Sequence, residues 1–157
     1  MTGAVVPMVV DFAFKKTRAY RVAYIRWKGP WSDRRIRSEF ARLAQYARKS
    51  GGRTGHWFFR EPGTRQWEVA LEVRGPKVRP AAPIGLKTYP ATRVASVVFD
   101  PEAVSPEVVY HGLMDWLRWR RKEGKVRSVG STREVYDGNP YTDAKAWSRT
   151  DVQFLVR

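Results

Sequence analysis

The chain contains the same order of predicted elements twice, and this repetition restricts the fold more than any other feature. Residues 21–27 and 93–99 share one β-rich pattern, and each run is followed by a predicted helix and two more predicted strands. A strand–helix–strand–strand unit used twice is typical of an α+β domain with pseudo-twofold symmetry. We therefore expect a curved antiparallel sheet that carries two helices on one face and a central groove between the halves.

One domain is expected to span residues 1–157, because a chain of 157 residues fills one core and is too short for two ordinary domains. The first half is placed at about residues 10–74 and the second half at 84–157. Between them, residues 75–83 contain three prolines and a glycine and are typical of a linker. Residues 11–15 alternate in polarity and predict a further short strand.

Both predicted helices carry signals at their ends. Ser32 can cap the first helix, and the pair Gly51-Gly52 can stop it. The second helix is expected to open at Ser105-Pro106, with proline in its first turn, and to end at Glu123-Gly124. Apolar side chains at helical spacing predict the inward stripes: Ile36, Phe40, Leu43 and Ala47 in the first helix, and Val109, Leu113, Trp116 and Leu117 in the second.

A β-hairpin is predicted after the first helix. Residues 56–60 and 67–73 are its strands, and Glu61-Pro62-Gly63 is expected to form the turn. In the second strand the alternation places Trp67, Val69, Leu71 and Val73 on one face and Glu68 and Glu72 on the other. Strands at about 127–136 and 149–156 complete the second half.

Charge and composition exclude several classes of function. The net charge of +15 would attract nucleic acid or acidic partners, but the basic residues are spread along the chain, and no helix-turn-helix, zinc finger or ribonucleoprotein-type motif is present. Cysteine is absent, and the two histidines, His56 and His111, are far apart in sequence. We therefore expect no metal site, no cofactor and no intrinsic DNA-binding motif.

No membrane association is expected. The apolar start, residues 5–10, lacks a basic region before it, contains a proline and stops at Asp11, so it predicts neither a signal peptide nor a membrane span. The expected location is the cytoplasm.

The strongest functional signal is the run Thr132-Arg133-Glu134-Val135-Tyr136. Glu134 and Tyr136 are two residues apart in a β-prone segment, so both side chains should project from one face of a strand. A carboxylate on the concave side of a sheet costs free energy unless a cation or a transferable proton compensates it. Glu134 is thus either the anchor of a cationic ligand, a general base for water, or a structural glutamate paired with an arginine such as Arg133 or Arg127.

Several motifs resemble one known family over nearly the whole chain from about Asp11. They are Val22-Ala23-Tyr24-Ile25 followed by Gly29-Pro30-Trp31, the strand within residues 84–95, Arg133-Glu134-Val135-Tyr136 with Asn139-Pro140, and Thr150-Asp151-Val152. Together they resemble the GyrI-like small-molecule-binding domain, which also forms the effector-binding part of bacterial multidrug-responsive transcription activators and is related in fold to the SOUL haem-binding group. Asp100-Pro101-Glu102 departs from the His-x-Gly-Pro-like turn of that family, so ligand contacts from this loop are not carried over.

The resemblance implies a cleft lined by aromatic groups, with an acidic residue at its base, that binds lipophilic and often cationic aromatic compounds. The acidic position corresponds to Glu134. Some members without a DNA-binding region are similar to this chain, and a subset hydrolyses the strained cyclopropane of DNA-alkylating natural products. Three hypotheses therefore remain open: a binding module for lipophilic aromatic molecules, a hydrolase in which Glu134 activates water with help from Tyr136 or Tyr24, and an inhibitor or regulator of a DNA-handling enzyme.

Further aromatic side chains are candidates for the same cleft. Tyr136 could stack on a ligand or hydrogen-bond to it, and Tyr24, in the first repeated strand, could face the same groove. Tryptophan rings attract cations and are also ordinary core residues, so each tryptophan has both interpretations. The candidate tryptophans are Trp67 and Trp57 in the hairpin, Trp116 on the inward stripe of the second helix, and Trp147, which could act as a lid.

Overall fold

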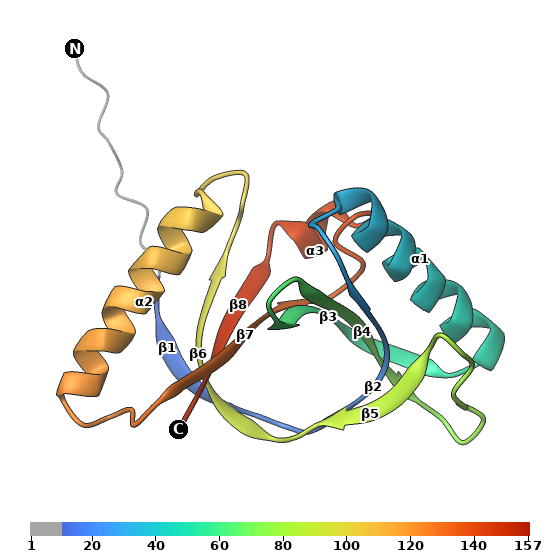
Figure 1. The fold of residues 1–157 in the computed structure, drawn as a ribbon, viewed down its shortest axis with the longest axis horizontal. Helices are drawn as coiled ribbons and strands as arrows, with labels where there is room; N and C mark the ends of the chain where they lie inside the picture. Colours follow the sequence, from blue (N-terminus) through green and yellow to red (C-terminus); the bar gives the residue numbers. More distant parts are fainter. Residues whose placement is uncertain (1–10) are drawn as a thin grey trace, which may run out of the picture.

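The structure, a computed structural model, describes residues 11–157, so the apolar start at residues 5–10 lies outside it (Figure 1). It is an α+β fold with eight antiparallel strands in one curled sheet. In chain order the elements are β1 (Ala13–Thr17), β2 (Tyr20–Lys28), α1 (Asp33–Ser50), β3 (Arg53–Gly63), β4 (Gln66–Arg74), β5 (Gly85–Tyr89), β6 (Thr92–Phe99), α2 (Pro106–Lys122), β7 (Val129–Tyr136), α3 (Ala144–Trp147) and β8 (Thr150–Val156).

The strand order confirms the duplicated arrangement. From edge to edge it is β1-β6-β8-β7-β3-β4-β2-β5, so β7 and β3 meet at the middle, and the strands outward from them correspond in pairs. The edge strands are exchanged between the repeats. β1 precedes the first repeat but pairs with β6 of the second, and β5 precedes the second repeat but pairs with β2 of the first.

The two long helices form where the sequence predicts them. The Ser32 side chain accepts a hydrogen bond from the backbone N of Arg35 at 3.1 Å, which caps α1 and contributes about 1 kcal/mol. Gly51, at φ 63°, ends α1 in the left-handed region. In α2, Pro106 stands in the first turn, and basic residues in the last turn complement the helix dipole.

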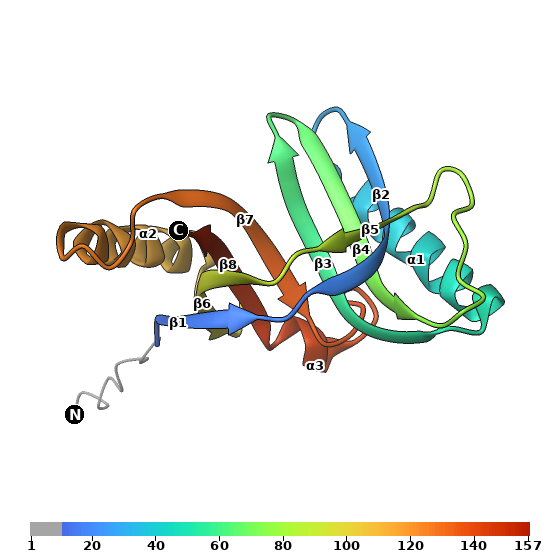
Figure 2. The same ribbon diagram turned by 90° about the horizontal axis from the view of Figure 1, so that it is seen from below.

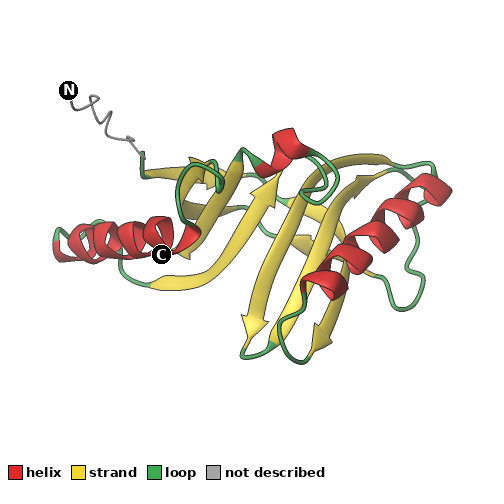
Figure 3. Ribbon diagram, turned by 90° about the horizontal axis from the view of Figure 1, so that it is seen from above, coloured by secondary structure: helices red, strands yellow, loops and turns green. Residues whose placement is uncertain are grey.

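Both helices cover the same face of the sheet, as expected. Cross-strand partners share a face, and one row of partners runs from under α1 to under α2. Figures 2 and 3 view the molecule from opposite sides, and α1 lies behind the strands in one and in front of them in the other. In order, the row contains Ile25, Val69, Phe59, Glu134, Val152 and Val97.

The helix-bearing face holds two apolar clusters, one under each long helix, and the cluster under α1 also takes in Tyr136 of β7 and Ala146 of α3. Ile36, Phe40, Leu43 and Ala47 of α1 pack on β2 and β4. Val109, Leu113 and Leu117 of α2 pack on β6 and β8 in a separate cluster. Because α1 and α2 cover separate clusters, a cavity can form on this face between the two helices, over β3 and β7.

One local prediction was wrong, and one short element was not predicted. The hairpin turn is not Glu61-Pro62-Gly63: β3 continues to Gly63, which pairs with Gln66, and the chain reverses between them, with Arg65 at φ 55°. An irregularity in the pairing between Arg60 and Gly63 accommodates Pro62, whose nitrogen cannot donate to a ladder. The short helix α3 was not predicted, because four residues give no helical periodicity to detect.

None of the helices formed by residues 11–157 is long and apolar enough to cross a membrane.

Candidate functional site

A cavity of about 670 Å³ opens on the helix-bearing face at the centre of the sheet. Residues from α1, β3 and β7 form its sides, and the segment that connects β7 to α3 closes one end. Half of the lining residues are aromatic, and the charged ones are Glu134 at the sheet and Asp33 and Arg37 on α1. The lining comprises Trp31, Asp33, Ile36, Arg37, Phe40, Phe59, Pro106, Glu134, Tyr136, Pro140, Tyr141 and Trp147.

Glu134 is the one charged member of the cross-strand row described above, between Phe59 on β3 and Val152 on β8. Two phenols hold its carboxylate. The hydroxyl of Tyr110, from α2, donates to Oε1 at 3.0 Å, and the hydroxyl of Tyr136 donates to Oε2. Glu134 and Tyr136 therefore share a face, as their spacing predicts.

The surroundings of Glu134 change how easily it ionises. Burial raises its pKa, and the hydrogen bonds from Tyr136 and Tyr110 oppose that increase without cancelling it. Burial and the neighbouring carboxylate raise the pKa of both phenols, so they remain hydrogen-bond donors at neutral pH. Ionisation of Glu134 therefore costs free energy when no cation lies beside the carboxylate.

The alternative in which Glu134 is a structural glutamate paired with Arg133 or Arg127 is not observed. Arg133 projects from the opposite face, and its Nε donates to Oε1 of Gln153 at 2.8 Å. Within residues 11–157, the side-chain hydrogen bonds of Glu134 come from the two tyrosines, and no ion pair to it is formed. Its charge is therefore available to a ligand.

Trp147 covers one end of the cavity. Its ring stacks on Tyr136, with centroids 6.4 Å apart and planes 17° from parallel. Its indole Nε1 donates to Oε1 of Glu102 at 3.2 Å. Glu102 belongs to the turn after β6, in which its backbone N donates to the Asp100 side chain at 3.0 Å. The atypical Asp100-Pro101-Glu102 turn thus helps to orient Trp147 through this hydrogen bond.

The Asn139-Pro140 motif contributes to the cavity wall through a turn. The Asn139 side chain accepts from the backbone N of Tyr141 at 3.0 Å, and this turn presents Pro140 and Tyr141 to the cavity. Tyr141 packs 6.0 Å from Phe40 of α1, and the Arg37 guanidinium lies 5.2 Å over the ring of Tyr141. Burial, Asp33 and Glu134 together raise the pKa of Tyr141 to about 12. The cavity rim therefore joins the two halves of the chain.

A smaller hollow of about 220 Å³ adjoins Glu134 on its other side. Trp67 lines it, with its ring roughly parallel to that of Phe59 at 6.2 Å, and Trp31 packs edge-on against Trp67 at 5.2 Å. The Trp67 indole N donates to the carbonyl of Gly29 at 3.0 Å, which fixes the ring. Glu134 therefore lies at the junction of two spaces rather than at the end of one.

Three of the candidate residues lie away from this cavity. Trp57 is a core residue that packs against Phe40 under α1. Trp116 packs on Phe12 and Phe14 beside β1, with ring centroids 6.0 and 4.7 Å away. Tyr24 belongs to the cluster on the face without helices, because alternation along β2 turns it away from Ala23 and Ile25.

Several cavity residues were not among the predicted site residues. Tyr110 lies in α2, and its helical position gave no sign that it would reach β7. Trp31 and Phe59 were part of the motifs and strands but not singled out. In the sequence, Trp31 is marked only by its place in the Gly29-Pro30-Trp31 motif, and its 56% exposure is visible only in the structure.

No group of three or more His, Cys, Asp and Glu side chains with the geometry of a metal site occurs in the described part of the chain.

Comparison with known proteins supports the fold. No model of a protein family and no curated protein matches the sequence. Among solved structures, the C-terminal domain of EcmrR aligns over 96% of this chain and 99% of its own, with a TM-score of 0.69 at 18% identity. This chain spans 57% of EcmrR in its complex with DNA.

Two further solved structures share the arrangement. SAV2435, solved with tetraphenylphosphonium bound, aligns over 94% of both chains with a TM-score of 0.53 at 9% identity. A hydrolase from Listeria innocua aligns over 93% of this chain and 91% of its own, with a TM-score of 0.62 at 9% identity. This chain has the GyrI-like fold. The acidic motif residue Glu134 lies at the sheet in the central cavity of this chain.

Proposed function

We propose that this GyrI-like domain binds lipophilic aromatic cations in the cavity at Glu134. The observation that carries the proposal is the carboxylate itself: it stands in an otherwise apolar cross-strand row, is held by two phenols, and forms no ion pair within residues 11–157. A cation placed beside it would compensate the cost of its burial.

The size and lining of the cavity favour such a ligand. A volume of about 670 Å³ lies within the ordinary range for small-molecule sites. The rings of Tyr136, Tyr141 and Trp147 can contact aromatic groups and also attract positive charge through their faces. The structural neighbour SAV2435 was solved with tetraphenylphosphonium, a ligand of this chemical class.

The net charge of +15 opposes the approach of a cation. Screening limits this repulsion, because the Debye length is about 8 Å at physiological ionic strength. Arginines on distant surfaces therefore contribute little close to Glu134, and Arg37 is the cation that lines the cavity with it. The affinity for a cation should rise on going from low to moderate salt, because salt screens the repulsion from the net positive charge.

A matched pair of ligands tests the charge preference. Methyltriphenylphosphonium and triphenylphosphine oxide present the same three phenyl rings, and only the first is positively charged. We expect the phosphonium to quench tryptophan fluorescence with the lower dissociation constant, since Trp147 and Trp31 line the cavity. Equal affinities for the two compounds would show that the cavity selects shape alone and would refute the role of Glu134.

A hydrolase is the second candidate, and the hollow of about 220 Å³ beside Glu134 is the observation that favours it. A water molecule there would lie next to a carboxylate whose pKa is raised, which suits a general base. Glu134 would take a proton from water as the water oxygen bonds to a cyclopropane carbon and the strained C–C bond of the ring breaks. The electron pair of that bond would pass to the conjugated group of the substrate, which then receives the proton back from Glu134. Tyr110 or Tyr136 would donate a hydrogen bond to the developing anion, whereas Tyr24 lies on the other face.

Mass spectrometry distinguishes the two candidates. A cyclopropane-bearing alkylator incubated with the protein should gain the mass of one water if the domain is a hydrolase of this class. The Glu134→Gln variant should lose this turnover. If the protein does not consume the alkylator faster than buffer does, but still binds methyltriphenylphosphonium, the hydrolase proposal is refuted and the binding proposal stands.

A further inference from the structure

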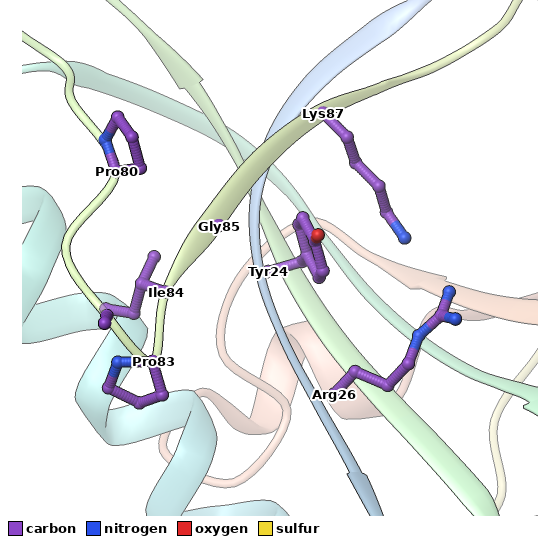
Figure 4. A pocket seen from close by; sticks show the side chains of 8 residues that line it. Tyr24, Arg26, Pro80, Pro83, Ile84, Gly85 and Lys87 are labelled. Atoms are coloured by element: carbon purple, nitrogen blue, oxygen red, sulfur yellow. The ribbon is translucent and has the colours of Figure 1, made fainter.

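The face of the sheet without helices carries a second hollow, of about 690 Å³, at the edge formed by β2 and β5 (Figure 4). Tyr24 and Arg26 reach it from β2, and Lys87 reaches it from β5. Pro80, Pro83 and Ile84, from the loop before β5, form an apolar wall. This site is separate from the cavity at Glu134, because strand alternation places the two on opposite faces.

Tyr24 is built into this hollow by a close fit. It pairs with Gly85 across the strands, and a Cβ added at Gly85 would meet the Tyr24 ring at 2.8 Å. Only glycine therefore lets the phenol lie across β5. The Lys87 ammonium lies 4.1 Å from the centroid of the same ring, in a cation–π contact that directs it toward the hollow.

Positive charge is in excess along this face. A row of cross-strand partners runs through Arg26, Glu68, Arg60, Arg133 and Gln153. It is the polar counterpart of the apolar row on the helix-bearing face. Lys87 also contacts Glu68. The row together with Lys87 therefore contains one carboxylate, that of Glu68, and four cations: Arg26, Arg60, Arg133 and Lys87.

Glu68 orders these cations without satisfying all their donors. It is fully buried, and its Oε1 accepts from Nε and Nη2 of Arg26 at 3.1 and 2.9 Å and from Nζ of Lys87. Its other oxygen accepts from the Tyr89 hydroxyl. Nη1 of Arg26 and two of the three ammonium hydrogens of Lys87 remain for other partners. Arg26 and Lys87 keep 43% and 27% of their side chains exposed, so a ligand in the hollow can reach them.

Two other acidic groups on this face, Glu72 and Asp151, form ion pairs. Arg18 and Arg74 bind Glu72, and Lys15 binds Asp151 at 2.6 Å. Burial lowers the pKa of Lys87 and the charges of Arg26 and Arg60 lower it further, in spite of its contact with Glu68. An additional anion near Lys87 would therefore relieve repulsion among the cations.

We propose that the hollow lined by Tyr24, Arg26 and Lys87 binds a small organic anion with an apolar body, such as an aromatic carboxylate. The carboxylate accepts hydrogen bonds from Arg26 and Lys87, and the apolar body lies against Pro80, Pro83 and Ile84. The domain thus has two sites of opposite charge preference on the two faces of one sheet.

Calorimetric titration with 2-naphthoate tests the proposal, and 2-naphthylmethanol provides the neutral control of the same shape. We expect saturable binding of 2-naphthoate and at least about tenfold weaker binding of the alcohol, because a hydrogen bond to a charged group is worth about 1.5–3 kcal/mol. Inorganic phosphate should compete only weakly, since it lacks the apolar body. Equal binding of naphthoate and alcohol, or competition by phosphate as strong as that by naphthoate, overturns the proposal.

Two variants locate the binding. Lys87→Gln removes one cation while Arg26, Arg60 and Tyr89 still contact Glu68. Ala82→Glu places a carboxylate at the exposed rim, away from the buried network, and should fold even if Lys87→Gln does not. Both should weaken 2-naphthoate binding by about tenfold.

Glu134→Gln serves as the control for the other face and should leave 2-naphthoate binding unchanged. If Glu134→Gln alters naphthoate binding and Ala82→Glu does not, the anion occupies the central cavity and the assignment to β2 and β5 is wrong. Thermal unfolding of each variant shows whether it is folded at the temperature of the titration.

Discussion

Replacing Glu134 with glutamine should weaken the binding of aromatic cations without unfolding the protein. Glutamine has the same shape and keeps one oxygen that can accept from Tyr110 or Tyr136, but it carries no charge. Because the pKa of Glu134 is raised, its ionised form costs stability in the folded protein. The wild type should therefore lose stability relative to Glu134→Gln as pH rises above the unfolded pKa of about 4.3.

The expected loss of affinity follows from the position of the carboxylate. A phosphonium centre about 6 Å from it gains about 3 kcal/mol at an effective dielectric of 20 and about 0.7 kcal/mol in bulk water. Glu134 is half-buried at the junction of two open spaces, so an intermediate value applies. We expect a loss of about 1–2 kcal/mol, which corresponds to about five- to thirtyfold in the dissociation constant.

Fluorescence titration with methyltriphenylphosphonium measures this change, with triphenylphosphine oxide as the neutral ligand. Glu107→Gln is the matched control, since it alters net charge equally at an exposed position outside the cavity lining. The neutral ligand should bind Glu134→Gln and wild type alike. Equal losses of phosphonium affinity in the two variants would attribute the effect to net charge and refute the reasoning from local geometry.

Three other predictions concern the supporting contacts. Tyr110→Phe removes the donor to Oε1 of Glu134, so the pKa of Glu134 should rise further and the pH midpoint of phosphonium binding should move up; an unchanged midpoint would contradict this contact. Gly85→Ala should cost about 1–3 kcal/mol in urea unfolding, because the new methyl group meets the Tyr24 ring, and an unaltered midpoint would mean that the ring can move aside. Arginine partners help lower the pKa of Glu72 to about 2, so its stabilising contribution should be present above pH 4.3, about its unfolded value, and be lost as pH falls toward 2; Glu72→Gln should abolish this part of the acid dependence of thermal unfolding.

Most of the scaffold could be predicted from local sequence patterns. The ends of α1 and α2 agree with the capping residues Ser32 and Gly51 and with Pro106, because caps act over a few neighbouring residues. The faces of β4 also agree, since strand alternation is a local property: Trp67 lies in the core under α1, and Glu68 lies on the other face. The hairpin turn was misplaced because an irregularity in strand pairing depends on the partner strand.

The candidate site was predicted only where its residues share one strand. Glu134 and Tyr136 lie together because their spacing fixes a common face. Tyr110 reaches Glu134 from α2, and no local sequence pattern around Tyr110 indicates that its hydroxyl lies close to Glu134. Tyr24 was a candidate for the same groove, yet it lies on the opposite face. Alternation shows which residues of a strand share a face, but it does not show which of the two faces the helices cover.

The sequence alone determined the duplicated order of elements, the helix ends, and the pairing of a carboxylate with a phenol at Glu134 and Tyr136. These features depend on periodicity and capping, which act between residues close in the chain. Only the tertiary structure decided that β7 lies beside β3, which places Glu134 between the clusters under α1 and α2. It also decided that the opposite row gathers Arg26, Glu68 and Arg133. Strand order and the relative phase of neighbouring strands are set by long-range packing, so the two faces acquired their opposite chemistry only when the sheet assembled.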